Sequence, residues 1–311
     1  MVISAPELAG LERAGYRLVG GNKHSAVKVC HWTKKSLLDK GFCFKQKFYK
    51  RFYGIESHRC LQMTPSMPFC DHKCVYCWRD ISITYPNWEG PCDEPAEILD
   101  GAIEAQRRLL SGFKGNPNAN RRKWEEAQDP TLCAISLAGE PTLYPKLSEL
   151  IAECHRRGMA AFLVTNGQHP ERLREIVEPT QLYISVVAPD EKTYLEVCRP
   201  QVSDGWKRLN ESLELMPSFK CRKVIRLTLV KGLNLKNAEG YARLIEKARA
   251  DFVEPKSYFA VGYSRYRLGP SFMPSHAEVK IFAEELAKLT GYAIVDESEP
   301  SRVVLLRNVE K

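Results

Sequence analysis

Three closely spaced cysteines, Cys70, Cys74 and Cys77, constrain this chain more than any other feature. Their C-x3-C-x2-C spacing puts three thiolates on one short loop, where they can hold three corners of a [4Fe–4S] cube and leave the fourth iron open. An open iron can bind a small molecule and pass it one electron. The alternative is a zinc knuckle, but zinc prefers four closed ligands, usually in C-x2-C pairs. The run therefore predicts a cluster-binding loop.

The chain has eleven cysteines among its 311 residues, a high and odd number. Residues 1–8 lack the basic start and apolar core of a signal peptide. No apolar run approaches the roughly 18 residues that span a membrane. In a reducing cytoplasm, so many cysteines favour metal binding over disulfides. We therefore expect a folded cytoplasmic protein with no membrane segment.

The net charge is +8, and three stretches place cations beside aromatic residues. Residues 45–53 interleave four cations with four aromatics, and residues 121–124 and 265–267 repeat the pattern in miniature. Cations can neutralise phosphates while aromatic faces stack on unpaired bases, so these stretches predict RNA contacts. For each stretch the alternative is a solvated basic face whose aromatics pack in the core.

Short β-branched runs alternate with helical patterns over most of the chain, which predicts a parallel sheet with right-handed crossovers. Strands are expected at about 59–63, 132–138, 161–165, 182–187, 223–230 and 258–263. Helices are expected at about 145–157, 170–177, 190–197, 204–215 and 238–249. Six β/α units are too few for a closed eight-stranded barrel. The sequence therefore predicts an open partial (β/α)6 barrel in the α/β class.

Several turns that can carry chemistry follow the expected strands. They are the cysteine loop, Gly139-Glu140-Pro141, Asn166-Gly167 and Gly262. In parallel α/β folds, chemistry gathers at the carboxyl ends of the strands. We expect three segments: a basic, cysteine-containing extension (1–55), the barrel (56–290) and a small hairpin (291–311) with strands near 292–295 and 303–306.

A second set of cysteines, Cys30, Cys43 and Cys60, lies upstream of the loop with long intervals. The segment around it shows little apolar periodicity, and such a segment often needs a metal to order it. Three possibilities stay open from the residues alone. The set can hold a structural zinc with His31 or His58, it can hold a second iron–sulfur cluster, or its thiols can be buried without a ligand.

The cysteine loop, with the aromatic Tyr76 before its last cysteine, resembles the signature of radical S-adenosylmethionine (SAM) enzymes. Longer blocks resemble the archaeal tRNA 4-demethylwyosine synthase family of wybutosine biosynthesis. These blocks are 23–36, 43–49, 54–65, 70–79, 137–145, 163–167, 227–232 and 262–265. The resemblance extends over about residues 16–290, and it implies a partial barrel of the radical SAM type.

The resemblance implies that Cys30, Cys43 and Cys60 ligate an auxiliary [4Fe–4S] cluster beside the cluster of the loop. It implies that N1-methylguanosine-37 in the anticodon region of tRNA(Phe) reacts with two carbons of pyruvate. SAM would be cleaved to a 5′-deoxyadenosyl radical, which would take hydrogen from the N-methyl group. Pyruvate would bind the auxiliary cluster or condense with a lysine, for which Lys45 is the candidate. An external one-electron donor and a monomer are expected.

The family pattern also places SAM contacts on this chain. Glu140 would bind the methionine amino group, and Asn166 and Ser185 would contact the SAM carboxylate or ribose. Two departures stand out. Val187 lies where an Asp is expected, and the Cys43–Cys60 interval is about four residues longer than expected, which suggests an extra loop at 50–53.

Two other function classes compete with this one. A radical SAM enzyme acting on a peptide or small molecule would explain both cysteine sets but not the basic–aromatic stretches. A non-catalytic, metal-ordered RNA-binding protein would explain the charge but not the strand-end turns.

Overall fold

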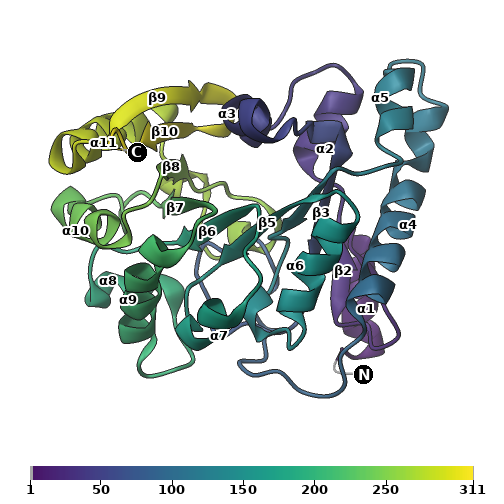
Figure 1. The fold of residues 1–311 in the computed structure, drawn as a ribbon, viewed down its shortest axis with the longest axis horizontal. Helices are drawn as coiled ribbons and strands as arrows, with labels where there is room; N and C mark the ends of the chain where they lie inside the picture. Colours follow the sequence, from purple (N-terminus) through teal and green to yellow (C-terminus); the bar gives the residue numbers. More distant parts are fainter. Residues whose placement is uncertain (1–2, 311) are drawn as a thin grey trace. The chain divides into compact units, whose positions relative to one another are not determined.

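Strands β3 to β8 alternate with helices along the chain in the computed structural model, which describes residues 3–310 (Figure 1). These residues divide into two units, each described here by itself. The first contains residues 3–69 and 87–164, and the second contains residues 70–86 and 165–310. The division falls within the chain at the cysteine loop, so Cys60 belongs to the first unit and Cys70 to the second.

The first unit carries strands in the order β1-β2-β3-β4-β5. Their bounds are β1 (Arg17–Val19), β2 (Ser25–Val27), β3 (Cys60–Thr64), β4 (Leu132–Ile135) and β5 (Ala160–Thr165, whose last residue is assigned to the second unit). The helices are α1 (Ala5–Arg13), α2 (His31–Leu37), α3 (Phe44–Tyr53), α4 (Pro95–Lys114), α5 (Arg121–Glu126) and α6 (Leu147–Arg156), with short 3-10 turns η1 (Ser57–Arg59) and η2 (Pro141–Leu143). β3, β4 and β5 are parallel, and β2 pairs antiparallel with β3.

The second unit carries strands in the order β6-β7-β8-β10-β9. Their bounds are β6 (Gln181–Ser185), β7 (Arg222–Leu229), β8 (Phe252–Ser257), β9 (Ala293–Ser298) and β10 (Val303–Arg307). The helices are α7 (Pro170–Glu175), α8 (Glu191–Cys198), α9 (Gly205–Leu215), α10 (Ala238–Ala248) and α11 (His276–Thr290), and a 3-10 turn η4 spans Gly262–Tyr266. β6, β7 and β8 are parallel, whereas β10 is antiparallel to both β8 and β9.

The central strands form because short apolar runs are buried on both faces. All four residues of β4 are buried, as are the first four of β6. A parallel sheet covered by helices on both faces favours such runs. In the first unit, α4 and α6 lie side by side (Figure 1) and α4 also contacts β2 and β3. Pro95 at the first position of α4 suits a helix start.

Most of the expected elements are confirmed, and one strand is wrong. The strand expected at 258–263 lies earlier in the chain, as β8. It was misplaced because its polar residues interrupt the apolar run that indicates a buried strand. Glu254 is buried in β8, where its carboxylate accepts a 2.9 Å hydrogen bond from Arg226 of β7. Pro255 also interrupts the strand pattern of β8. The C-terminal hairpin is confirmed as β9 and β10, and the long helices α4 and α11 had not been predicted.

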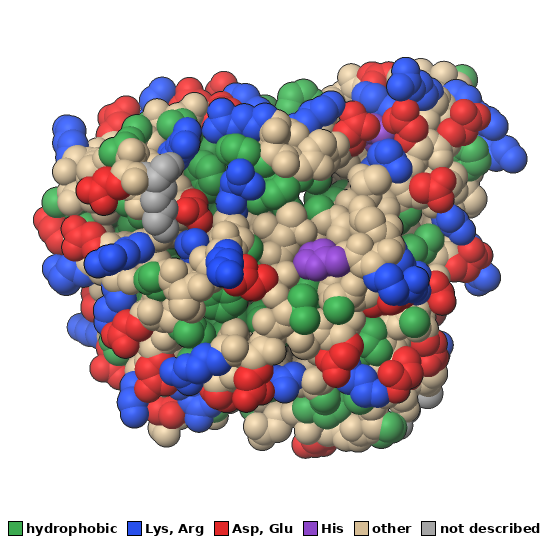
Figure 2. Space-filling model, in the orientation of Figure 1, with side chains coloured by type: hydrophobic (Ala, Val, Ile, Leu, Met, Phe, Trp, Pro, Cys, Tyr) green, Lys and Arg blue, Asp and Glu red, His purple; other side chains and the backbone are tan. Residues whose placement is uncertain are grey.

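Charged side chains of both signs mix over the surface near α5, at the upper right of Figure 2. Arg121 pairs with Glu125 and Arg122 with Glu126, each at 2.8 Å and four residues apart on the helix. Such exposed pairs contribute little to stability. None of the helices in residues 3–310 combines the length and the apolar character that a membrane span needs.

Candidate iron–sulfur sites

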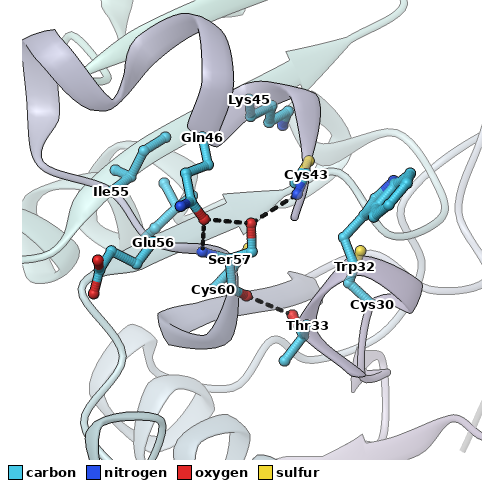
Figure 3. Close-up of a pocket in the computed structure, with 11 residues that line it drawn as sticks. Cys30, Trp32, Thr33, Cys43, Lys45, Gln46, Ile55, Glu56, Ser57 and Cys60 are labelled. Atoms are coloured by element: carbon cyan, nitrogen blue, oxygen red, sulfur yellow. Dashed lines mark hydrogen bonds between the residues drawn. The ribbon is translucent and has the colours of Figure 1, made fainter. Parts of the chain in front are cut away.

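A cavity in the first unit brings together Cys30, Cys43, Cys60 and Lys45, as predicted (Figure 3). It encloses about 300 Å³ of empty space, part of it open to solvent. Cys30 immediately precedes α2, Cys43 immediately precedes α3, and Cys60 begins β3. Three elements that are distant in the sequence therefore each deliver one thiol to the same cavity.

The electrostatics of this cavity suit a bound cation. Burial raises the pKa of the Cys60 thiol, and the nearby Cys30 and Cys43 raise it further, whereas the positive charge of Lys45 opposes them. The Cys60 thiol thus resists ionisation in the absence of a strong positive centre. Iron bound to the sulfurs would supply that centre, because a coordinating thiol is deprotonated.

The ligand atoms of these three cysteines do not form one of the tight groups found among the described residues. Among the described residues, two groups converge closely enough to share one ion, and neither includes Cys30 or Cys43. A zinc ion needs its sulfurs about 2.3 Å from the metal and so close together. The three cysteines line one cavity, and three thiols are the ligand set that an open-site cluster would need.

Neither histidine of the zinc alternative lines the cavity. His58 is buried, and its Nε2 lies 2.8 Å from Glu126 Oε2 and 3.4 Å from Glu56 Oε2. Its Nδ1 lies 3.4 Å from the Ser36 hydroxyl. Burial lowers the pKa of His58, which favours the neutral imidazole. His58 therefore braces α5 against η1 and is not directed at the thiols.

A hydrogen-bond network centred on Ser57 fixes the cavity wall (Figure 3). The Ser57 hydroxyl accepts from the Cys43 amide at 2.8 Å and donates to Gln46 Oε1 at 2.7 Å. The Ser57 amide also donates to Gln46 Oε1 at 2.8 Å, and Thr33 Oγ1 donates to the Ser57 carbonyl at 2.8 Å. The network links α2, α3 and η1. No local sequence pattern indicated this network.

Lys45 lies in the first turn of α3, with its side chain half-buried. Its Nζ lies 5.3 Å from the centre of the Phe162 ring, a distance typical of a cation–π contact. The extra residues Lys50–Tyr53 continue α3 and do not form the predicted loop. Four residues add about one helical turn, and they come after Lys45, whose position at the cavity they leave in place.

Three of the five aromatics of α3 face the core, and the other two, Phe52 and Tyr53, are half-buried. Phe44, Phe48 and Tyr49 are buried, whereas Lys47 is exposed. The helix is amphipathic, with aromatics on one face and cations on the other. For these three aromatics the core-packing alternative is confirmed, and base stacking by them is excluded.

The loop with Cys70, Cys74 and Cys77 belongs to the second unit, where none of the three cysteines forms a disulfide and all three are half-buried. Backbone hydrogen bonds hold its path. The Cys70 amide donates to the Tyr85 carbonyl at 2.9 Å, and the Cys77 amide donates to the Cys74 carbonyl at 3.1 Å. Three cysteines on one loop held by backbone hydrogen bonds fit the three protein ligands of an open-site cluster.

Cys198 is buried at the end of α8 and also contacts this loop. Ligand atoms of Cys198, His72 and Cys74 lie within 4.8 Å of one another. A hydrogen bond with Cys198, together with burial, raises the pKa of Cys74. His72 Nε2 lies 2.7 Å from the Tyr194 hydroxyl. Spacing alone could not have indicated this contact.

Asn166 contacts the cysteine loop directly. Its Nδ2 donates to Asp71 Oδ1 at 2.5 Å, and His169 Nε2 lies 2.8 Å from Asp71 Oδ2. Burial opposes ionisation of Asp71, but the hydrogen bond with His169 and the proximity of His72 hold its pKa below the ordinary range. Asp71 and His169 were missed, although Asp71 directly follows Cys70.

The remaining predicted SAM contacts lie at strand ends. Ser185 is the last residue of β6 and is half-buried. Val187, two residues later, is buried, and its carbonyl accepts from Asn234 Nδ2 at 2.7 Å. No polar side chain therefore comes from position 187.

In the first unit, Glu140 is buried and its Oε1 accepts hydrogen bonds from the amide and hydroxyl of Thr142, at 3.0 and 2.6 Å. Its amide donates to the carbonyl of Phe69, which directly precedes Cys70, at 2.7 Å. Gly139 has φ +68, and a Cβ there would lie 1.9 Å from the Ser66 carbonyl oxygen. The turn thus requires glycine and fixes Glu140 to the segment that enters the cysteine loop.

A cysteine loop of this spacing on an alternating β/α frame defines a radical SAM enzyme, and comparison with known proteins agrees. The Radical SAM superfamily matches residues 64–245, and the family of wyosine base formation matches residues 247–308. The chain is 53% identical to the S-adenosyl-L-methionine-dependent tRNA 4-demethylwyosine synthase of Pyrococcus horikoshii over 301 residues, which covers 94% of this chain and 85% of that protein.

Two solved structures extend the similarity to the fold. One is a structure of TYW1 with a lysine–pyruvate adduct bound, with a TM-score of 0.89, 36% identity and coverage of 100% of this chain and 98% of that one. The other is the crystal structure of archaeal TYW1, with a TM-score of 0.80, 34% identity and coverage of 99% and 98%.

The chain therefore belongs to the tRNA 4-demethylwyosine synthase family, radical SAM enzymes of wybutosine biosynthesis. The predicted fold class, an open partial (β/α)6 barrel of the radical SAM type, is confirmed. Membership implies SAM and one [4Fe–4S] cluster as cofactors.

Proposed function

We propose that this enzyme joins N1-methylguanosine-37 of tRNA(Phe) to two carbons of pyruvate, forming 4-demethylwyosine. The observation that carries the proposal is the cavity that gathers Lys45 with Cys30, Cys43 and Cys60. A lysine–pyruvate adduct in a related structure of 36% identity supports it. An amine at a half-enclosed cavity is the group that can condense with the ketone of pyruvate and release water.

In this proposal Cys70, Cys74 and Cys77 hold the first cluster. When bound, that cluster supplies the electron that cleaves SAM and so generates the 5′-deoxyadenosyl radical that takes hydrogen from the N-methyl group. Glu140 would hold the methionine ammonium, which suits a buried carboxylate. Asn166 and Ser185 would contact the carboxylate or ribose of SAM. The Asp71–Asn166 hydrogen bond would orient that amide.

In the first unit, Cys30, Cys43 and Cys60 would hold the auxiliary cluster. Lys45 would anchor pyruvate as an imine beside it, and the ring of Phe162 would cover one side of the lysine end. The alternative for pyruvate is chelation at the open iron of that cluster. The Ser57 network would hold the three thiols and Lys45 in fixed positions relative to one another.

The partners follow from the same proposal. The tRNA would present its anticodon region, and a separate protein or reductant would deliver the single electron. We further propose that the enzyme acts as a cytoplasmic monomer, with residues 1–55 as an extension that supplies auxiliary-cluster ligands and RNA contacts, 56–290 as the barrel and 291–311 as the C-terminal hairpin.

Isotope incorporation tests the reaction. Reduced, reconstituted enzyme is incubated with SAM, pyruvate and tRNA(Phe) carrying N1-methylguanosine-37, and the nucleosides are analysed by mass spectrometry. Pyruvate labelled with ¹³C at its second and third carbons should add both labels to the tRNA, whereas label at the first carbon should be absent. SAM cleavage without any tricyclic product would contradict the proposal.

A further inference from the structure

The turn η4 presents aromatic rings to solvent, unlike the other two basic–aromatic stretches. Of the four aromatics in residues 45–53, Phe48 and Tyr49 are buried in α3, and Phe52 and Tyr53 are half-buried. Trp124 of α5 is half-buried, and its Nε1 donates to the Leu110 carbonyl at 3.0 Å. In η4, by contrast, Tyr266 is 78% exposed. Of the three stretches, therefore, the one around 265–267 exposes its aromatic ring most fully to a ligand.

Three side chains of η4 form a small platform. Tyr263 is 39% exposed, and its ring centre lies 6.1 Å from that of Tyr266 at an interplanar angle of 72°. The Arg265 guanidinium lies 5.7 Å from the centre of the Tyr266 ring. Arg265 Nε donates to the Gly262 carbonyl at 2.9 Å, which restricts its side chain. The platform thus combines two aromatic rings with one positive charge.

The core holds this platform from below through Ser264. That residue is buried, and its hydroxyl donates to the Val261 carbonyl at 2.7 Å. The buried Tyr258 lies below it, with its hydroxyl 3.1 Å from the Ser264 hydroxyl and 2.8 Å from the Leu268 carbonyl. Because Ser264 points inward, its neighbours Tyr263 and Arg265 point outward. A preorganised platform loses little conformational entropy when it binds.

The same turn is fastened to the cysteine loop within the second unit. Gly262 has φ +58, and a Cβ there would lie 2.3 Å from the Trp78 carbonyl oxygen. The Tyr263 amide donates to that oxygen at 2.9 Å. Arg267 donates from Nε to the Val75 carbonyl at 3.1 Å and from Nη2 to the Cys77 carbonyl. The platform therefore has a fixed place beside the last cysteine of the loop.

We propose that Tyr263, Arg265 and Tyr266 form a stacking platform for an unpaired nucleobase of the RNA substrate. The inference rests on the proposed function, since it requires an RNA whose bases are presented near the cysteine loop. Residues 258–274 contain two arginines and no acidic residue, which suits a polyanion. Aromatic rings with an adjacent arginine are the surface that binds single-stranded bases without reading their sequence. The platform would position the anticodon loop and would not take part in the chemistry.

The test measures binding of an anticodon stem-loop RNA carrying N1-methylguanosine-37 to the reconstituted holoenzyme. Tyr263→Ala/Tyr266→Ala should weaken binding by about 10-fold or more, because stacking is worth about 1–3 kcal/mol per base. Tyr263→Phe/Tyr266→Phe should retain binding, because the ring and not the hydroxyl makes the contact. Arg265→Gln should reduce the slope of log affinity against log salt by about 1. The matched control is Ile281→Ala, an exposed side chain on α11.

Iron content and SAM cleavage without RNA report on folding, and both should match wild type in every variant. Double-alanine binding within twofold of wild type, while wild type binds and modifies RNA, would overturn the platform and leave the proposed function standing. A wild-type enzyme that binds no RNA would overturn both. A wild-type dimer that the double-alanine variant dissolves, with RNA binding unchanged, would assign the surface to a second copy of the chain and also overturn it.

Discussion

The two cysteine sets are assembled in opposite ways. Cys70, Cys74 and Cys77 come from a single loop of the second unit, held by backbone hydrogen bonds. Cys30, Cys43 and Cys60 come from the starts of α2, α3 and β3 in the first unit and meet at one cavity. The first arrangement is local in sequence, and the second exists only because the chain folds.

This difference has a physical consequence for each set. In a loop that carries all of the ligands, the covalent chain keeps the ligands close together. Such a ligand set can therefore be predicted from the sequence alone. A set drawn from three elements needs side-chain hydrogen bonds to hold its spacing, and the Ser57 network supplies them. A lysine can be placed among such ligands without lying close to them all in sequence. We infer that the dispersed set is the one built around a substrate.

The largest expected effect is the loss of one cysteine site with the other left intact. Cys70→Ala/Cys74→Ala/Cys77→Ala should lower SAM cleavage to the level of a protein-free control, because no thiolate remains to hold the first cluster. The first unit should still trap pyruvate on Lys45 with borohydride, detected as a mass increase of the intact protein. Loss of pyruvate trapping in this variant would show that the two sites do not form independently, which would contradict the contrast between the two cysteine sets.

Replacing the lysine should have the next largest effect. Lys45→Arg removes the nucleophilic amine and keeps the positive charge, so product formation should fall by at least about 100-fold. Iron content and SAM cleavage should persist. Lys47→Arg is the matched control, an exposed lysine on the same helix. Equal losses in both variants would remove the case for a covalent role of Lys45.

A smaller effect is expected from the network that holds the dispersed set. Ser57→Ala leaves the Cys43 amide without its acceptor and removes one of the two donors to Gln46 Oε1, which should cost about 1–3 kcal/mol of local stability. Hydrogen exchange in denaturant should show this loss in residues 30–60 and not in 70–77. Ser218→Ala, an exposed serine of the second unit, serves as control. A uniform loss over both segments would argue against a local role for Ser57.

The smallest effect is a difference in acid sensitivity. Burial lowers the pKa of His58, so its stabilising effect is complete above the ordinary value of 6.5 and is lost as the pH falls below it. Although burial opposes it, hydrogen bonding to His169 lowers the pKa of Asp71, so that contribution is complete above 3.8 and is lost only at lower pH.

Between about pH 7.5 and pH 5, corrected amide exchange should therefore accelerate in residues 56–60 by less than about tenfold and stay constant in 70–77. Equal acceleration in both segments would show that His58 does not distinguish the sites.

Much of the fold was predictable because its strands are short apolar runs with helices between them. β8 was misplaced because Glu254, Pro255 and Lys256 interrupt that pattern, and a buried Arg226–Glu254 ion pair compensates for the polarity. The added turn of α3 was mistaken for a loop, since repeated basic and aromatic residues fit an amphipathic helix equally well.

The residues of the candidate sites also differ in whether the local sequence could predict them. The loop cysteines follow from spacing alone, whereas the dispersed cysteines and Lys45 needed the family resemblance before the structure brought them together. The contacts of Cys74 with Cys198 and of Asp71 with His169 join residues about 100 positions apart or more, and no local pattern encodes such pairs.

The most direct test of the account is the metal content of anaerobically reconstituted protein, compared between wild type and Cys30→Ala/Cys43→Ala/Cys60→Ala. Two cubes of four irons predict about eight irons in wild type and about four in the variant, with SAM cleavage retained. About four irons in both proteins, with one zinc lost in the variant, would contradict it. The dispersed set would then be a structural zinc site.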